Sequence, residues 1–223
     1  LDELPYDGGK IRLNSVCGVN LNASNLYKSG VRNYTVTIGP EIDHDWVDAI
    51  RAISRLKTAR VGIAGYRAHG FFNLGVSDPA AIGQLGTLVD HFELDEIWNF
   101  PADQKAIAER EEKLRATFST GGVTGTQVGK VAALAANLDG FLERHSLAAL
   151  ALRCWPEFAA CSGISPCAAL SLLQAEDRIL ACEGDLEGAL SMLVHRAIGA
   201  ETPFLFDFSQ VDLKEDFALF WHC

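Results

Sequence analysis

The stretch "RILACEGDLEGALSMLVHRAIG", residues 178–199, contains the pattern on which the fold prediction depends. Residues 178–183 are mostly apolar and predict a buried strand, whereas residues 186–199 carry apolar side chains at helical spacing. Between the two elements stands a carboxylate, Glu183. A carboxylate at the end of a buried strand is costly unless it is paired, hydrogen-bonded or bound to a cation, so Glu183 is the first candidate for a functional role.

The same order of strand and helix recurs along most of the chain. Strands are predicted at residues 34–39, 59–66, 94–100, 147–155, 178–183 and 202–212. Helices are predicted at residues 43–59, 79–92, 101–118, 124–146, 165–177 and 186–199. This alternation predicts an α/β fold in which a parallel β-sheet is flanked by helices, as in Rossmann-like and flavodoxin-like domains.

Composition excludes several classes of function. The net charge of −10 and the sequence pI of about 5.0 argue against nucleic acid as a partner, because phosphate binding needs a basic surface. No apolar run approaches the roughly 18 residues of a membrane span, so no membrane is expected as a partner. The six cysteines contain no CxxC pair, which favours free thiols in a reducing, cytoplasmic setting over a zinc cluster.

In parallel sheets the ligand site lies at the carboxyl ends of the strands. Five polar or aromatic side chains fall at or just beyond the ends of predicted strands, and they are expected to meet at one edge of the sheet: Arg67, Trp155, Glu157, Glu183 and Asp207.

Glu183 and Asp207 are the strongest pair of candidate functional residues, because each follows a run of apolar residues. With His222 they would offer two carboxylates and one imidazole, a donor set that suits Mn²⁺ or Mg²⁺ better than Zn²⁺. Each residue also has a simpler interpretation: either acid could cap a helix or pair with an arginine, and His222 could be a buried core histidine. Asp185 is expected to cap the helix that follows it.

Trp155 and Glu157 suit a sugar, because an aromatic ring can stack on it while a carboxylate accepts hydrogen bonds from its hydroxyl groups. Trp155 could equally pack a loop. Arg67 lies in the glycine-rich stretch "GIAGYRAHGFFNLG", residues 62–75, and could reach a ligand or remain solvated. That stretch matches neither GxGxxG nor GxxxxGK[ST], so it gives little support for nucleotide binding.

Four stretches together resemble the L-fucose isomerase-like family, relatives of L-arabinose isomerase: "RVGIAGYRAHGFFN", "LRCWPEF…SPCAALSLL", "ACEGDLEGALSML" and "FLFDFSQVD…FWHC". They cover residues from about 58 to 223 in order, and residues 11–57 fit more loosely. As a set they are moderately to highly specific, although each alone would be weak.

The resemblance implies three parts in this chain. Residues 1–57 would be the end of an N-terminal α/β domain, residues 58–205 a second α/β domain that carries the catalytic carboxylate, and residues 206–223 the start of a β-rich domain. The chain begins with Leu and stops after an apolar stretch, so we expect it to be a piece of a longer protein.

The resemblance also implies an Mn²⁺-dependent aldose–ketose isomerase, with Mg²⁺ or another divalent cation as alternatives. Glu183 matches the family's general base and metal ligand, Asp207 its second carboxylate ligand, and His222 a ligand position of the related arabinose isomerases. A small sugar would be the substrate, and the full-length protein would form a trimer or hexamer. A further ligand histidine has no counterpart here, so the fragment itself would be incomplete.

Two other classes of function stay open at this stage. A non-catalytic sugar-binding α/β module would share the architecture, and metal-dependent ketose formation would distinguish the isomerase from it. A nucleotide-using oxidoreductase is disfavoured, because a dinucleotide-binding fingerprint is missing.

Overall fold

The computed structural model describes residues 15–37 and 41–222. The chain forms two compact units that divide after Asp45. In the first unit, α2 (Ser15–Lys28) is followed by a turn and by residues 31–37, which form neither helix nor strand. The strand predicted at residues 34–39 is wrong for residues 34–37, which form no strand, and residues 38 and 39 lie outside the described residues. A β-branched run needs a neighbouring strand to pair with before it becomes part of a sheet.

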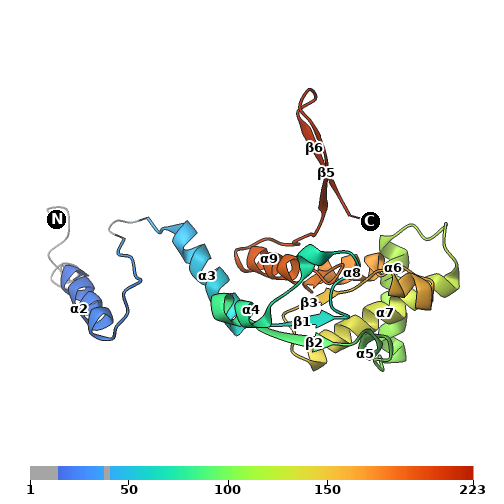
Figure 1. Cartoon of the computed structure of the whole chain (residues 1–223), viewed down its shortest axis with the longest axis horizontal. Coiled ribbons are helices and arrows are strands. Elements are labelled where there is room, and N and C mark those ends of the chain that lie inside the picture. The colour runs from blue at the N-terminus through green and yellow to red at the C-terminus, as the bar shows by residue number, and fades with distance from the viewer. Residues whose placement is uncertain (1–14, 38–40, 223) are drawn as a thin grey trace, which may run out of the picture. The chain divides into compact units, whose positions relative to one another are not determined.

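The second unit is built around a parallel sheet of four strands (Figure 1). They are β1 (Arg60–Ala64), β2 (Leu88–Phe92), β3 (Ala149–Leu152) and β4 (Leu180–Ala181), arranged in the order β2-β1-β3-β4. After β1 the chain adds β2 on one side, and it then returns to add β3 on the other. This reversal creates a switch point between β1 and β3, the place where open α/β sheets bind ligands.

Helices cover both faces of the sheet, as the prediction of an α/β fold requires. One face packs against α5 (Leu94–Trp98), α7 (Gly125–Arg144) and α8 (Cys167–Gln174), with α6 (Gln104–Thr117) against α7. The other face packs against α3 (His44–Thr58) and α9 (Leu186–Ala197), while α4 (Asp78–Leu85) contacts β2. Two short helical turns, η1 (Phe72–Leu74) and η2 (Phe158–Ser162), follow β1 and β3.

The central strand β3 shows why the sheet is buried on both faces. Leu150 and Leu152 belong to the hydrophobic cluster under α7 and α8, and Ala149 and Ala151 to the cluster under α9. Side chains alternate between the two faces of a strand, so a strand apolar at every position must be covered on both sides. All four residues are fully buried.

Two predicted elements around β2 are wrong. The helix predicted at residues 79–92 ends at Leu85, because Gly86 adopts a left-handed conformation that caps it, and residues 88–92 form β2 instead. The strand predicted at residues 94–100 is the helix α5, which begins with a capping box between Glu93 and Glu96.

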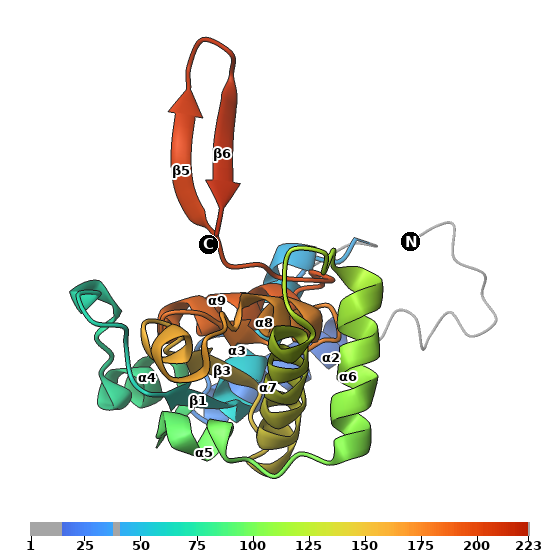
Figure 2. The same cartoon turned by 90° about the vertical axis from the view of Figure 1, so that its right-hand side faces the viewer.

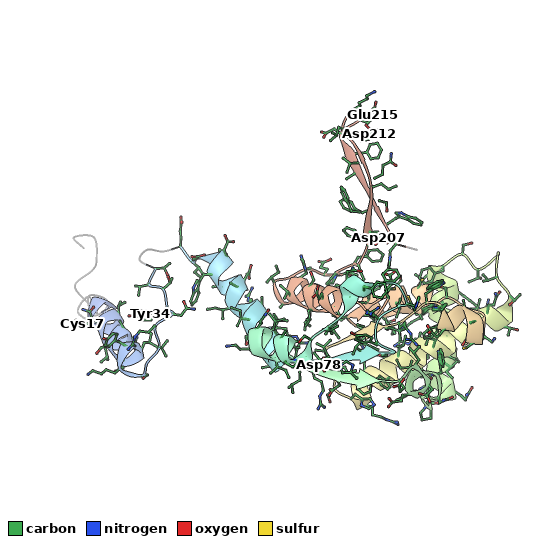
Figure 3. All side chains as sticks on the ribbon, viewed as in Figure 1. Cys17, Tyr34, Asp78, Asp207, Asp212 and Glu215 are labelled. Carbon is green, nitrogen blue, oxygen red and sulfur yellow. The ribbon has the colours of Figure 1, made fainter. Side chains whose placement is uncertain are left out.

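The chain continues after α9 into an antiparallel hairpin of β5 (Asp207–Asp212) and β6 (Phe217–Trp221). The strand predicted at residues 202–212 therefore begins later than expected, and Asp207 opens a strand rather than following one. The hairpin extends away from the helices, and both of its ends lie at its base (Figure 2). Figure 3 places Asp207 at that base and Asp212 and Glu215 at the tip.

Candidate active site

A cavity of about 780 Å³ opens at the carboxyl ends of β1, β3 and β4. Each strand leads directly into it: Ala68 follows β1, Trp155 follows β3 and Glu183 follows β4. The remaining wall comes from the residues that precede α8, from Gln127 of α7 and from His222 after β6. The cavity thus lies at the switch point of the sheet and at the carboxyl ends of its strands, the edge at which the sequence analysis expected a ligand.

The backbone of Glu183 is held in a left-handed conformation, with φ of 63°. Its N–H donates to Sγ of Cys154 at 3.4 Å, and its carbonyl accepts the N–H of Ala68 at 2.9 Å. These two hydrogen bonds tie the residue to the segments after β3 and β1. This conformation is strained for a non-glycine residue. Such strain is typical of functional sites, where the surrounding structure fixes the direction of a side chain.

Gly184 makes that turn possible. Its own φ is 73°, and its N–H donates to the carbonyl of Leu152 at 3.0 Å. A Cβ atom at this position would lie 2.0 Å from the carbonyl oxygen of Tyr66, which is far inside van der Waals contact. Only glycine therefore lets the turn after β4 pass so close to the segment after β1.

Asp185 completes the turn in the role that the sequence predicted. Its side chain accepts the N–H of Gly188 at 2.8 Å and caps α9. The two neighbouring acids are thus used differently: Asp185 satisfies the start of a helix, whereas Glu183 forms no ion pair with a lysine or arginine of the described residues.

The electrostatic surroundings of Glu183 favour its neutral form. Burial raises the pKa of its carboxyl above the ordinary value; the charge of His222 lowers it, and those of Asp207 and Asp185 raise it. A raised pKa brings a carboxyl closer to neutral pH, where a general base works best.

His222 and Asp207 meet at the base of the hairpin. Nδ1 of His222 lies 3.3 Å from an Oδ atom of Asp207. The imidazole is 10% exposed and the carboxylate 66% exposed, and Nε2 of His222 is buried without a hydrogen-bond partner among the described residues. Sequence reasoning placed Asp207 at the end of a parallel strand, which is wrong, because the residue opens β5.

The donor types of these three residues fit a divalent cation, and an orphaned imidazole nitrogen fits an unfilled ligand position. In the part of the chain that the structure describes, however, no three His, Cys, Asp or Glu side chains are grouped closely enough to hold a metal ion. The chain therefore brings Glu183 and His222 to one cavity and Asp207 to His222, without assembling a finished metal centre.

Of the remaining predicted residues, only Trp155 lines the cavity, where its indole is exposed. Glu157 forms an ion pair with Arg153 at 2.8 Å, which is the simpler interpretation of that acid. The guanidinium of Arg67 lies over the ring of Phe72 at 4.9 Å and over that of Tyr66 at 5.5 Å, and its Nε is buried without a hydrogen-bond partner in the described part of the chain. Arg67 is thus beside the turn of Gly184 but not in the cavity wall.

Sequence reasoning missed the three cysteines of the cavity wall, which are Cys154, Cys167 and Cys182. The neighbouring Cys182 thiol lowers the pKa of the Cys154 thiol, against the effect of burial, and Cys154 together with burial raises the pKa of Cys182. A signal was available, because Cys154 and Cys182 stand just beyond successive apolar strands, at the same edge as Glu183.

Comparison with known proteins finds several relatives that carry the same name. The chain is 27% identical to a sulfoquinovose isomerase of Priestia aryabhattai, over 98% of the chain and 51% of that protein. It is 28% identical to the protein of that name from Alkalicoccus urumqiensis, over 98% of the chain and 52% of the relative. For the one from Clostridium sp. (strain MSTE9) the identity is 26%, over 100% of the chain and 52% of the relative. The chain thus spans about half the length of the curated relatives it matches.

No family model matches the chain. Among the described residues, no helix has the length and apolar character needed to cross a membrane. The relatives' names fit a family of sugar isomerases in general, and they do not single out the L-fucose isomerases to which the motifs pointed.

Proposed function

We propose that the whole protein to which this chain belongs is an aldose–ketose isomerase, and that its substrate is sulfoquinovose, an aldose that carries a sulfonate group. The observation that carries the proposal is Glu183. It stands on a left-handed turn at the edge of a 780 Å³ cavity, with a raised pKa and no basic ion-pair partner among the described residues. The names of the relatives supply the substrate.

In this proposal Glu183 is the base that moves a proton between neighbouring carbons of the sugar. Its carboxylate removes the proton from C2 of the aldose, which leaves an enediolate with its charge on O1. A proton then passes from O2 to O1, and Glu183 returns its own proton to C1 to give the ketose. The hydrogen bonds from Glu183 N–H to Cys154 and from Ala68 N–H to the Glu183 carbonyl keep the backbone fixed while the side chain changes its charge. Trp155 offers an aromatic face on which the sugar can stack.

We further propose that Glu183, Asp207 and His222 hold a divalent cation, Mn²⁺ in the first instance. Such an ion would bind two neighbouring sugar oxygens and stabilise the negative charge that develops on them. The support is the donor chemistry of the three residues and the unpartnered Nε2 of His222. The contact between Asp207 and His222 orients the imidazole independently of any metal ion.

The test uses the purified whole protein after treatment with EDTA, with and without added Mn²⁺ or Mg²⁺. Sulfoquinovose, L-fucose and L-arabinose are offered separately in D₂O, and NMR follows both the ketose and the uptake of deuterium from solvent. We expect ketose formation from sulfoquinovose that depends on metal and is lost in Glu183→Gln. Deuterium exchange at C2 is expected to fall with it, because the base is the group that handles this proton.

Glu187→Gln is the matched control, since Glu187 is an exposed acid four residues further along the same stretch. It should retain full activity. Tight sugar binding that is indifferent to both metal and Glu183→Gln, with no ketose from any of the three sugars, would instead indicate a non-catalytic sugar-binding module. Faster turnover of L-fucose than of sulfoquinovose would retain the isomerase and overturn the substrate.

A further inference from the structure

Two thiols stand side by side next to Glu183. Cys154 lies just beyond β3 and Cys182 directly after β4, and these strands are neighbours in the sheet. Sγ of Cys154 lies 3.4 Å from the backbone nitrogen of Glu183, the residue that directly follows Cys182. Adjacent parallel strands lie about 4.8 Å apart, so rotation of the two side chains can bring the sulfur atoms to bonding distance.

Both thiols can be reached by a small molecule. Each lines the 780 Å³ cavity that also contains Glu183. Cys154 is partly exposed there, whereas Cys182 is 8% exposed and lies beneath it. A third thiol, Cys167, lines the same cavity, and its sulfur lies 2.9 Å from Oγ of Ser165. The arrangement gives an accessible first thiol and a buried second thiol that follow neighbouring strands and line one cavity.

We propose that Cys154 and Cys182 form a reversible disulfide when the protein meets a peroxide, and that this bond switches off the site of Glu183. The sulfur of Cys154 attacks the peroxide, the O–O bond breaks, and one oxygen stays on the sulfur as a sulfenic acid while an alcohol or water leaves. The sulfur of Cys182 then attacks that sulfur, the S–O bond breaks, and water departs with the thiol proton. Two thiols and one peroxide thus give one disulfide and the reduced peroxide.

The link to Glu183 is its backbone N–H, which donates to Sγ of Cys154 at 3.4 Å. A disulfide moves that sulfur toward Cys182 and weakens the hydrogen bond that helps to hold Glu183 in its left-handed conformation. Cys182 also directly precedes Glu183. The new bond therefore constrains the Glu183 turn through its hydrogen-bond partner Cys154 and through the preceding residue Cys182. This loss of activity rests on the proposed function, whereas the formation of the disulfide does not.

The experiment treats the reduced whole protein with hydrogen peroxide, blocks the remaining thiols and maps peptides under non-reducing conditions. We expect a cross-linked peptide pair that contains Cys154 and Cys182, and at least a roughly 10-fold loss of isomerase activity. Dithiothreitol should remove the cross-link and restore the activity together. Circular dichroism before and after oxidation checks that the fold is retained.

Variants separate the roles of the thiols. Cys154→Ala should abolish the cross-link, and Cys182→Ala should leave a sulfenic acid on Cys154 that dimedone traps. Cys161→Ala is the control, since Cys161 is exposed and outside the cavity wall, and it should oxidise and recover like the wild type. Should Cys182→Ala fail to fold, the peptide map of the wild-type protein still shows whether the disulfide between Cys154 and Cys182 forms.

Three outcomes would overturn the proposal. In the first, Cys154 and Cys182 remain open to alkylation in folded protein while the exposed cysteines oxidise. In the second, Cys154 links to Cys167 instead. In the third, the disulfide forms without loss of activity. A reduced protein that makes no ketose would refute the proposed function alone, because the peptide map reports on the thiols independently.

Discussion

Two glutamates flank the short strand β4 and are used in opposite ways. Glu176 precedes the strand and forms ion pairs with Arg110 and Lys113, the latter at 2.7 Å. Burial raises its pKa, but these hydrogen bonds and charges outweigh burial and lower the pKa overall. Glu183 follows the strand, has no basic ion-pair partner among the described residues, and has a raised pKa.

The difference distinguishes the end of the unit that ion pairs stabilise from the end at which we propose the chemistry takes place. The end of the sheet near Glu176 belongs to an ion-pair network in which Arg110 and Arg178 bind acids of α7. At the opposite end the acid is partly buried, has no lysine or arginine partner among the described residues, and is strained in its backbone. Unpaired acids cost stability, so their presence at one end of a sheet is an argument for function there.

The largest expected effect comes from exchanging the two glutamates for glutamine in turn. Glu183→Gln should lower kcat/KM of the whole protein about 100- to 10,000-fold, as expected for loss of a general base, without lowering the free energy of unfolding. Glu176→Gln should leave kcat/KM unchanged and lower the free energy of unfolding by about 1–2 kcal/mol. Steady-state kinetics and urea unfolding measure the two effects. Equal losses of activity in both variants would contradict the assignment of a catalytic role to Glu183 and a structural role to Glu176.

Arg110→Met should lower the free energy of unfolding more than Glu176→Gln does. The Arg110 side chain is only 12% exposed and joins Asp139, at 2.6 Å, to Glu176. Removing it leaves two acids short of a partner in partly buried surroundings, at a cost of about 3 kcal/mol. Urea unfolding at neutral pH measures this cost. Lys105→Met is the control, because Lys105 and Glu109 are exposed and 3.9 Å apart, and it should cost under about 0.5 kcal/mol.

The effect of pH tests the same network with a defined sign. The pKa of Glu176 is lower in the folded protein than its ordinary value, so the folded state binds fewer protons than the unfolded state near that value. Its stabilising contribution is complete above about pH 4.3, and it is lost as the pH falls through the folded pKa. The difference between wild type and Arg110→Met should therefore shrink in acid, and a difference that grows would contradict the ion-pair account.

The turn that aims Glu183 can be tested with two glycines in the same conformation. Gly184 and Gly163 have φ of 73° and 67°, but only at Gly184 would a Cβ meet backbone, 2.0 Å from the Tyr66 oxygen. Gly163→Ala should cost about 1 kcal/mol for the left-handed conformation. Gly184→Ala should cost about 2 kcal/mol more, since the segment after β1 must move, and should also lower activity. Equal costs in urea unfolding would mean that the close approach is unimportant.

Sequence patterns were sufficient for the layers of the fold and for the edge of the sheet at which the cavity lies. Apolar runs such as residues 147–155 predict buried parallel strands, and the carboxyl-end rule then places Glu183 and Trp155 at one cavity. The errors around β2 came from local signals that were present but outweighed by apolar spacing. Gly86 marked the end of a helix, and the pair Glu93 and Glu96 marked the start of another.

Other features depend on contacts that no local pattern contains. Asp207 lies near His222 because a hairpin folds back on itself, and its register follows from pairing between strands. Arg67 stacks on the aromatic rings of Phe72 and Tyr66. The left-handed backbone of Glu183 follows from hydrogen bonds to residues about 30 and 115 positions earlier in the chain, so only the assembled sheet reveals it.

The smallest expected effect concerns Asp185, whose cap and charge can be separated. Asp185→Ala removes the hydrogen bond to the Gly188 N–H and should lower the free energy of unfolding by about 1 kcal/mol. Asp185→Asn keeps a capping oxygen and should preserve most of that stability.

Asp185→Asn also removes a negative charge that helps to raise the pKa of Glu183. The carboxyl of Glu183 should then ionise more easily, so the acidic limb of the pH–rate profile should move to lower pH in Asp185→Asn and in Asp185→Ala alike. A limb that moves only in the alanine variant would mean that the cap positions Glu183 through the backbone. In that case the contrast with Glu176 would be one of geometry rather than of charge.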